Sequence, residues 1–245
     1  MADQLKTATV GELVAADYRA AGVMEQFGID FCCGGGQSLA DACGRAAVDP
    51  VAVQKALDTL ATQKAVKTDL ADVGSWPLDR LIDHIVTTHH RYVRSAIPTI
   101  AHHLALLQKA HGNHHPELTF VVDTFNEMSG DMERHMLKEE QILFPYVREL
   151  ALAEPSPCTS VQNPFGTIVN PITMMEREHV EVAEDLHVIR ELTNDYTVPP
   201  DGCATYAVCM AELADFERDL HRHVHLENNV LFPRAVALES TQSDD

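Results

Sequence analysis

Two segments of the sequence repeat a histidine and a glutamate at the same spacing. They read HMLKEEQILFP, starting at His135, and HVHLENNVLFP, starting at His223. In a helix, a histidine and a glutamate four residues later lie on one face, and here that face continues a stripe of apolar residues. Burying a carboxylate costs several kcal/mol unless it is paired or bound to a metal. The spacing therefore predicts that bound cations neutralise Glu139 and Glu227.

Two further histidines, His84 and His179, interrupt the apolar stripes of two other predicted helices. A single buried histidine is more often an ordinary hydrogen-bonded core residue, but six matched interruptions favour a metal site. Imidazole with carboxylate favours Fe, Mn, Zn or Co over Ca or Mg, and a glutamate can bridge two ions. Six protein ligands would leave coordination positions for an oxygen species or a small gas. The predicted ligands are His84, His135, Glu139, His179, His223 and Glu227.

Four long helices are expected to carry these side chains. Their predicted ranges are about 78–110, 117–150, 171–194 and 203–238, and turn-forming residues separate them. Two short loops and one long connection predict an all-α protein built on a four-helix bundle. Each repeat ends in a Phe-Pro step. The proline predicts a kink or a local break of the helix just beyond the ligands.

A small helical domain is expected before the bundle. Thr9 followed by Glu12 predicts a capping box that starts a helix reaching about Gln26. The turn GIDFCCGGG follows it, and two short helical stretches come next. We expect this cysteine-containing domain to span residues 1–68 and the bundle to span residues 77–239.

Composition limits the classes of partner and compartment. The formal net charge of −19 argues against binding a phosphate backbone, so a nucleic-acid partner is not expected. No apolar run approaches the roughly 18 residues of a membrane span, and the N-terminus, MADQLKTATV, lacks a basic head and an apolar signal core. A cytoplasmic protein without a membrane partner follows, and its six cysteines are expected to be reduced thiols.

The sequence resembles the hemerythrin-like di-iron proteins of the Repair of Iron Centres family over nearly its whole length. The segments that carry the resemblance are DFCCGGGQSLADA, LIDHIVTTHH, HMLKEEQILFP, MEREH and HVHLENNVLFPRA, in the order of the family. Matched residue by residue, the iron ligands of the family fall on the six residues already chosen from helical phase. The resemblance implies a hemerythrin-like bundle with two non-haem iron ions joined by an oxo or hydroxo bridge.

The resemblance also implies a function. Such a protein would repair iron–sulfur clusters damaged by nitrosative or oxidative stress, by supplying iron to damaged iron–sulfur proteins. The alternative is nitric oxide binding, or its reduction to nitrous oxide at the di-iron centre, which would make the protein an enzyme of the nitric oxide reductase type. A pure binding role and a structural bundle with zinc or an empty core stay open. Oxygen carriage is disfavoured, because the five-histidine pattern of carriers is not evident.

Cys32 and Cys33 have a functional and a structural interpretation. Adjacent thiolates on a glycine-rich turn could accept iron or exchange electrons, with backbone amides lowering the pKa of the thiols. Alternatively, the CCGGG turn ends a helix and buries small residues. The chemistry alone leaves both open, and the resemblance favours the functional one. Cys43 departs from the family pattern and is assigned no role; a buried small hydrophobe is one interpretation of it.

The remaining histidines receive weaker assignments. His90 lies on the same helix as His84 and is expected behind the ligands or along an access path. His187 could join the outer shell of the site. His221 and His225 point away from His223 around the helix, so we expect them to face solvent or a neighbour. A group near a helix end is expected to form a solvated polar surface: His102, His103, His111, His114 and His115.

Overall fold

The computed structural model describes residues 8–62, 73–153 and 163–243, and these residues form helices with one isolated bridge between Thr9 and Ser38. The all-α expectation is confirmed. The chain divides into two compact units, each described by itself. Unit 1 contains residues 1–83, 147–169 and 221–245, and unit 2 contains residues 84–146 and 170–220. The domain boundaries expected from the sequence stay a prediction, because their connection falls partly outside the described residues.

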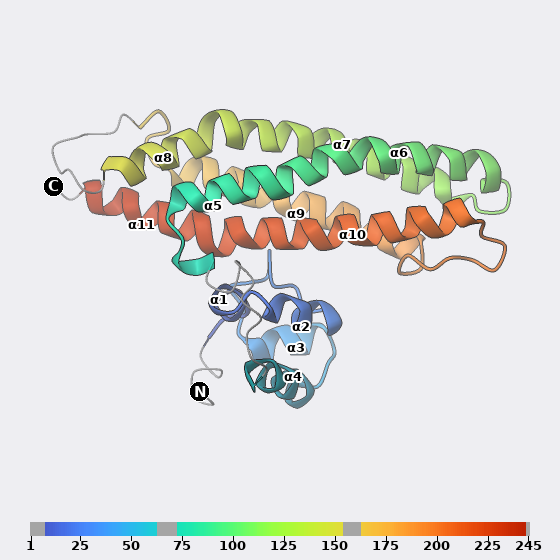
Figure 1. Cartoon of the computed structure of the whole chain (residues 1–245), viewed down its shortest axis with the longest axis horizontal. Coiled ribbons are helices and arrows are strands. Elements are labelled where there is room, and N and C mark those ends of the chain that lie inside the picture. The colour runs from blue at the N-terminus through green and yellow to red at the C-terminus, as the bar shows by residue number, and fades with distance from the viewer. Residues whose placement is uncertain (1–7, 63–72, 154–162, 244–245) are drawn as a thin grey trace. The chain divides into compact units, whose positions relative to one another are not determined.

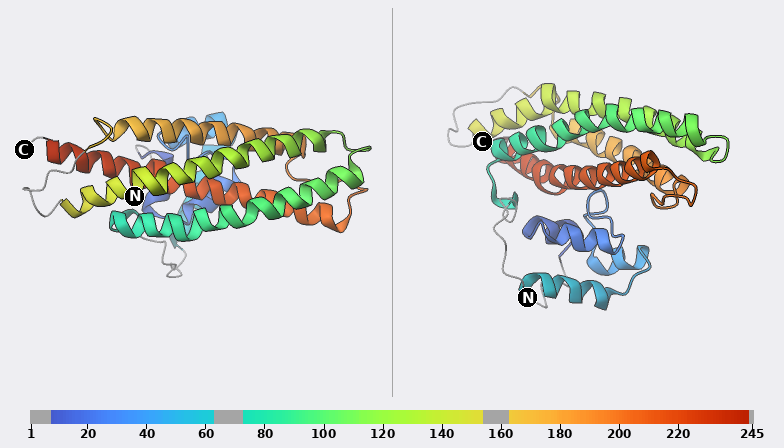
Figure 2. Two further views of the ribbon diagram at one scale, coloured as in Figure 1. Left: turned by 90° about the horizontal axis from the view of Figure 1, so that it is seen from above. Right: turned by 45° about the vertical axis from the view of Figure 1, so that its right-hand side comes forward.

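Unit 2 is built from long antiparallel helices that lie side by side in every view (Figures 1 and 2). They are α6 (Arg91–His111), α7 (Glu117–Lys138), α9 (Val169–Leu192) and α10 (Ala204–Leu226). The apolar stripes meet in one core, where the rings of Phe125 and Phe216 make an edge contact at 5.6 Å between centroids. The first, second and fourth expected ranges are each covered by a run of consecutive helical segments, at 78–111, 117–153 and 204–243, and the third corresponds to α9. A long amphipathic stripe is a strong helix signal.

Unit 1 contains the short helices of the N-terminal segment: α1 (Val10–Ala16), α2 (Ala20–Gln26), α3 (Leu39–Arg45) and α4 (Pro50–Thr62). It also contains most of α5 (Leu78–His84), α8 (Phe144–Ala153) and α11 (Phe232–Ser243), together with the 3₁₀ turn η2 (Val73–Ser75). The capping box of Thr9 and Glu12 is present.

The single helix expected to reach Gln26 is wrong, because the chain turns after Ala16. Asp17, the C-cap residue of α1, has an extended backbone with φ −144° and ψ 99°. Its carboxylate accepts a hydrogen bond from the Arg19 amide at 3.1 Å and also binds the Arg19 guanidinium. Such local bonds from an aspartate compete with the helical hydrogen bonds. The result is two seven-residue helices in place of one.

Three π-helical segments interrupt the long helices at the histidine and glutamate motifs. They are η3 (Ile85–His90), η4 (Glu139–Leu143) and η5 (Glu227–Leu231). The last two end directly before Phe144-Pro145 and Phe232-Pro233, where the α-helix resumes. The local disturbance expected from these prolines therefore takes the form of a wide turn. A proline provides no N–H for an α-helical bond, and a π segment accommodates that loss without ending the helix.

Candidate metal centre

Buried histidines and glutamates converge in two overlapping groups that could hold metal ions among the described residues. The first group is His135, Glu139, His179 and Glu227, and the second is His90, Glu139, His223 and Glu227. In each group the potential ligand atoms lie within 4.8 Å of one another. Glu139 and Glu227 belong to both groups, which is the arrangement that bridging carboxylates require. The structure brings five of the six predicted residues together and adds His90.

His84, the sixth predicted residue, is in neither group. It ends α5 and is half-buried, with its Nδ1 at 3.3 Å from the Thr88 hydroxyl and its ring edge against His89. His90 is fully buried at the end of η3. A π segment has more residues per turn than an α-helix, so a phase count at 3.6 residues per turn does not predict which histidine of this stretch faces the carboxylates. His84 as a ligand stays a prediction.

His135 is oriented by a carboxylate on a neighbouring helix. Its Nδ1 lies 2.9 Å from Oε2 of Glu178, which also binds Lys138. The hydrogen bond from His135, with that from Lys138, lowers the pKa of Glu178 to about 2 against the opposing effect of burial. An ionised carboxylate only accepts hydrogen bonds, so Nδ1 of His135 carries the proton and Nε2 presents a lone pair. That Nε2 lies 3.4 Å from Glu139 and 3.0 Å from Nε2 of His179.

His90 has an equivalent support. Its Nδ1 lies 2.6 Å from Oε1 of Glu140, and its Nε2 lies 3.4 Å from Oε2 of Glu139. Burial acts to raise the pKa of Glu140, but hydrogen bonds from Arg94 and His90 outweigh it and hold that pKa below its usual value. The Glu140 carboxylate therefore accepts a hydrogen bond from Nδ1–H of His90, and the lone pair on Nε2 of His90 faces Glu139. Neither Glu140 nor Glu178 breaks an apolar stripe, so helical phase does not reveal these supporting glutamates.

The donor set fits a pair of transition-metal ions. Two ligands at about 2.1 Å from one ion and at a right angle to each other are about 3.0 Å apart, which is the separation of the two Nε2 atoms of His135 and His179. Nε2 of His223 lies 2.8 Å from Oε1 of Glu227, and both side chains are fully buried. Imidazoles with lone pairs directed at buried carboxylates suit Fe, Mn, Zn or Co.

Removing a supporting carboxylate should weaken metal binding. We expect Glu178→Gln to reduce metal affinity about 10- to 100-fold, because the amide no longer fixes the orientation and basicity of His135. Competition with a chromophoric chelator measures this affinity. Glu181→Gln on the same helix is the control, since Glu181 is exposed and pairs with Arg177 at the surface. Equal affinity of the Glu178 variant and the unchanged protein would show that this hydrogen bond does not support the site.

The cysteine turn is organised around Asp30. Its carboxylate accepts hydrogen bonds from the amides of Cys32 and Gly34, at 3.0 and 2.8 Å, and from the thiol of Cys32 at 3.3 Å. The hydrogen bond with Cys33, burial and the nearby negative charges raise the pKa of Cys32 well above its ordinary value. The expectation that amides lower the pKa of this thiol is wrong for Cys32, because the amides bind Asp30 instead.

The other cysteines of the described residues are also free thiols. Cys43 is fully buried in α3 and burial raises its pKa, in agreement with the small-hydrophobe interpretation. Cys158 lies outside the described residues.

Side chains from the end of α10 and from η5 bind the cysteine turn and its surroundings within unit 1. The Asn229 amide in η5 donates to the carbonyl oxygens of Phe31 and Cys32, at 3.3 and 2.9 Å. Nδ1 of the buried His225 lies 3.1 Å from the Phe31 carbonyl oxygen, and Arg222 pairs with Glu25. His225 thus faces a neighbouring segment, one of its two expected environments. Asn229 lies two residues after Glu227, so the turn is held directly against a segment that carries a candidate ligand.

Glycine is required where this turn meets η5. A Cβ atom at Gly11 would lie 2.3 Å from Oδ1 of Asn229, and one at Gly35 would lie 2.2 Å from the same atom. The Gly11 amide also donates to the Gly35 carbonyl at 2.7 Å. The three residues therefore pack at distances that no side chain at either glycine would permit. No sequence signal reveals this contact, because it joins residues far apart in the chain.

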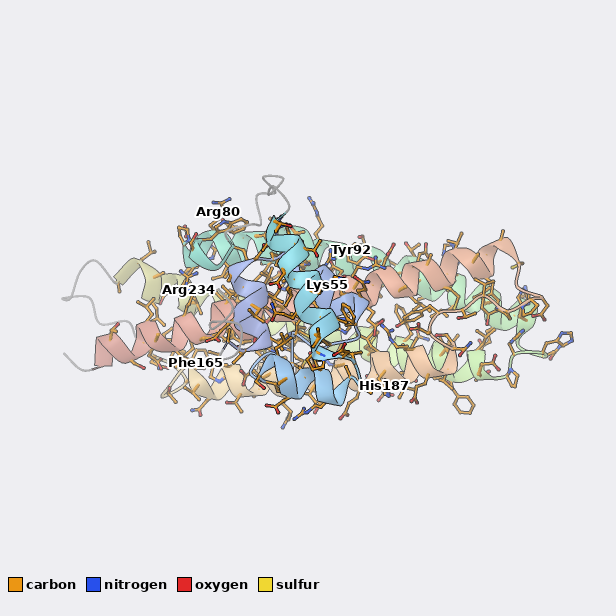
Figure 3. All side chains as sticks on the ribbon, turned by 90° about the horizontal axis from the view of Figure 1, so that it is seen from below. Lys55, Arg80, Tyr92, Phe165, His187 and Arg234 are labelled. Carbon is orange, nitrogen blue, oxygen red and sulfur yellow. The ribbon has the colours of Figure 1, made fainter. Side chains whose placement is uncertain are left out.

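His187 lies away from the candidate site. It projects from α9 at the outside of the ribbon (Figure 3), is 68% exposed at its side chain and pairs with Glu191. A role in the outer shell of the metal site is therefore not supported.

Among the residues that the structure describes, no helix is both long and apolar enough to cross a membrane.

Comparison with known proteins identifies two matching families and close relatives. The Hemerythrin HHE cation binding domain matches residues 81–235, and the ScdA_N domain, described as a domain of unknown function (DUF542), matches residues 6–61. Iron–sulfur cluster repair protein YtfE of Escherichia coli O17:K52:H18 (strain UMN026) is 34% identical over 230 residues, which cover 94% of this chain and 97% of that protein. The protein of the same name from Escherichia fergusonii has the same identity and coverage.

Proposed function

Because the chain belongs to the family of hemerythrin-domain iron–sulfur cluster repair proteins, we propose that it repairs iron–sulfur clusters damaged by nitrosative or oxidative stress. The observation that carries the proposal is the pair of buried ligand groups that share Glu139 and Glu227. The proposal places the protein in the cytoplasm, with damaged iron–sulfur proteins as its partners. In this proposal the protein repairs damaged clusters by supplying them with iron.

The residues of the bundle have distinct tasks in this proposal. Glu139 and Glu227 would hold both iron ions, His135 and His179 would bind at one position, and His90 and His223 would bind at the other. Bound iron would supply a redox-active pair of ions that can take small ligands. An oxo or hydroxo bridge would join the two ions in addition to the two carboxylates. Glu178 and Glu140 keep the protons of His135 and His90 at Nδ1, which directs both lone pairs inward.

The cysteine turn is the proposed exit for iron. Cys32 is 5% exposed and its thiol is bonded to Asp30, whereas Cys33 is half-buried. Cys33 is therefore the better placed first acceptor, and Cys32 can join it only after its bond to Asp30 breaks. Asn229, two residues after Glu227, donates a hydrogen bond to the Cys32 carbonyl oxygen. This bond keeps the cysteine turn beside a segment that would release iron.

Replacing both thiols separates storage of iron from its delivery. We expect the double variant Cys32→Ser/Cys33→Ser to keep its iron content and absorption spectrum but to lose repair, because no soft acceptor remains at the turn. Recovery of activity by a nitric oxide-damaged iron–sulfur dehydratase measures repair. The exposed Cys203→Ser is the control and should repair normally. Unchanged repair by the double variant would remove these cysteines from the mechanism and leave the metal site untouched.

A second candidate function is binding of nitric oxide, or its reduction to nitrous oxide. It is favoured by the two adjacent ligand groups, since two ions sharing carboxylates could each take one molecule of the gas. Anaerobic addition of nitric oxide to the reduced protein, with repeated reduction, distinguishes the two roles. Nitrous oxide released over many cycles would support catalysis, and a stoichiometric complex without nitrous oxide would support binding alone.

A further inference from the structure

A second cluster of titratable side chains lies at one end of the helices of unit 2. His111 ends α6, His115 lies in the connection to α7, and Asp201 and Cys203 immediately precede α10. The start of α7 is about 27 Å from His135 along that helix, at 1.5 Å per residue. The metal centre therefore makes no use of this cluster, whose histidines are expected from the sequence to form only a solvated polar surface.

Cys203 and His111 are in direct contact. The Cys203 sulfur lies 3.3 Å from Nε2 of His111, and the cysteine is exposed. The ring of His111 is held in place by an edge contact with Tyr206 at 5.5 Å and a tilted contact with His115 at 6.3 Å. Packing on two sides therefore fixes the imidazole that faces the sulfur, while the sulfur itself is open to solvent.

The backbone adds to this environment. The carbonyl of Cys203 accepts the first helical hydrogen bond of α10, from the Ala207 amide at 3.1 Å, so Cys203 is the N-cap residue. The backbone amides of Thr205 and Tyr206, at the start of α10, also lower the pKa of Cys203. A long helix carries partial positive charge at this end, and these amides favour an anion there.

The two carboxylates near Cys203, those of Asp201 and Glu117, form hydrogen bonds with His115 and not with His111. His115 lies between Asp201 and Glu117, at 3.0 and 2.9 Å, and hydrogen bonds to them, Asp201 first, raise its pKa. His115 in turn lowers the pKa of Asp201. His111, and not His115, is thus the histidine in contact with the sulfur. The titratable groups around Cys203 are His111, His114, His115, Glu117, Asp201 and Tyr206.

We propose that Cys203 and His111 form a thiolate–imidazolium pair that undergoes thiol–disulfide exchange with small disulfides. The thiolate attacks one sulfur of the disulfide, a new bond forms to Cys203, and the old sulfur–sulfur bond breaks. The second half of the disulfide leaves as a thiolate and takes a proton from His111 or solvent. The disulfide is the oxidant, so no other electron acceptor is needed. This modification site is independent of the proposed repair function.

The titration of Cys203 agrees with this geometry. The hydrogen bond with His111, followed by those with the backbone amides, lowers the pKa of Cys203 to about 7. Disulfide exchange is fastest for a thiol whose pKa is near the ambient pH, because such a thiolate is both abundant and nucleophilic. Burial has the opposite effect on Cys209, where it raises the pKa to about 12. Among the described cysteines, Cys203 combines exposure with a lowered pKa.

Alkylation kinetics of the full-length, iron-loaded protein test the pair. Peptide mass mapping after iodoacetamide treatment, from about pH 5.5 to about pH 9, gives the reaction rate of each cysteine separately. We expect the rate at Cys203 to rise with a midpoint of about pH 7. In His111→Gln the midpoint should move toward the value of a free thiol, and the rate at pH 7 should fall about tenfold. His114→Gln, which changes an exposed neighbour, should behave as the unchanged protein.

Incubation with glutathione disulfide tests the exchange step. A mixed disulfide should form on the Cys203 peptide, reverse with added thiol, be slowed in His111→Gln and be absent in Cys203→Ser. A midpoint in the unchanged protein equal to that of a free thiol would overturn the pair, whatever the stability of the variants. A lowered midpoint without any mixed disulfide would overturn the proposed exchange. Neither result depends on repair activity.

Discussion

Replacing Glu139 and Glu227 together by glutamine is expected to abolish paired iron binding. Both carboxylates belong to both ligand groups, so the double variant removes the negative charge from each metal position at once. The loss of affinity should exceed the 10- to 100-fold typical of an outer hydrogen-bond partner. Metal analysis of the purified protein, combined with its absorption spectrum, measures the loss.

The same variant should not unfold the metal-free protein. Glu139 and Glu227 are fully buried, and replacing a buried carboxylate by a neutral group of similar size removes a desolvation cost. We therefore expect an equal or higher thermal midpoint without metal, and a lower one only when iron is supplied to both proteins. Glu133→Gln, at an exposed position of α7, is the matched control. Paired iron that survives in the double variant would show that these carboxylates are not the ligands.

The packing of Gly11 against Asn229 should make the cost of a substitution at Gly11 depend on the residue at position 229. In the unchanged protein, Gly11→Ala places a methyl group 2.3 Å from Oδ1 of Asn229, and we expect a loss of about 1–3 kcal/mol in the free energy of unfolding. In an Asn229→Ala background this contact is gone, and the carbonyl oxygen of Gly35, 3.0 Å from the added methyl group, is the close contact that remains. The same substitution should then cost clearly less, because Gly11 lies in α1 and alanine favours a helix.

Urea denaturation of the four proteins of this cycle measures the coupling between the two positions. Gly36→Ala in the cysteine turn is the control, because a Cβ atom there would meet no atom within 4 Å. Asn229→Ala alone should also destabilise, since it removes hydrogen bonds to two carbonyl groups. Additive effects of Gly11→Ala and Asn229→Ala would show that α1 does not pack on Asn229 of η5 as described.

The sequence was sufficient to predict the long helices and most of the site, for a physical reason. Helices with a buried stripe repeat every 3.6 residues, so a histidine or glutamate that breaks the stripe can be placed on the inner face without a structure. His135, Glu139 and His179 were found in this way and do come together. His90, which the sequence places behind the ligands or along an access path, lies in a ligand group, because the stretch from Ile85 to His90 is π-helical and follows a different period.

The remaining differences concern contacts that no local pattern encodes. The supporting bond from Glu178 to His135 and the bonds of Asn229 to the cysteine turn join segments distant in sequence. The environment of Cys32 was misjudged because Asp30, in the same turn, takes the backbone amides that were expected to favour a thiolate. Composition and spacing show which titratable side chains are present. The pKa of each side chain depends on which partners it contacts in the folded protein.

The wide turns occur at the same point of the two matched motifs, since η4 begins at Glu139 and η5 begins at Glu227. A π segment has more residues per turn than an α-helix, so the residues beyond it are rotated about the helix axis relative to the stripe that precedes it. The third helix has no such segment, because α9 is α-helical throughout and presents His179 in phase with its apolar stripe. As a consequence, the two matched helices can turn one face to the metal ligands and another face to their surroundings within a single continuous helix.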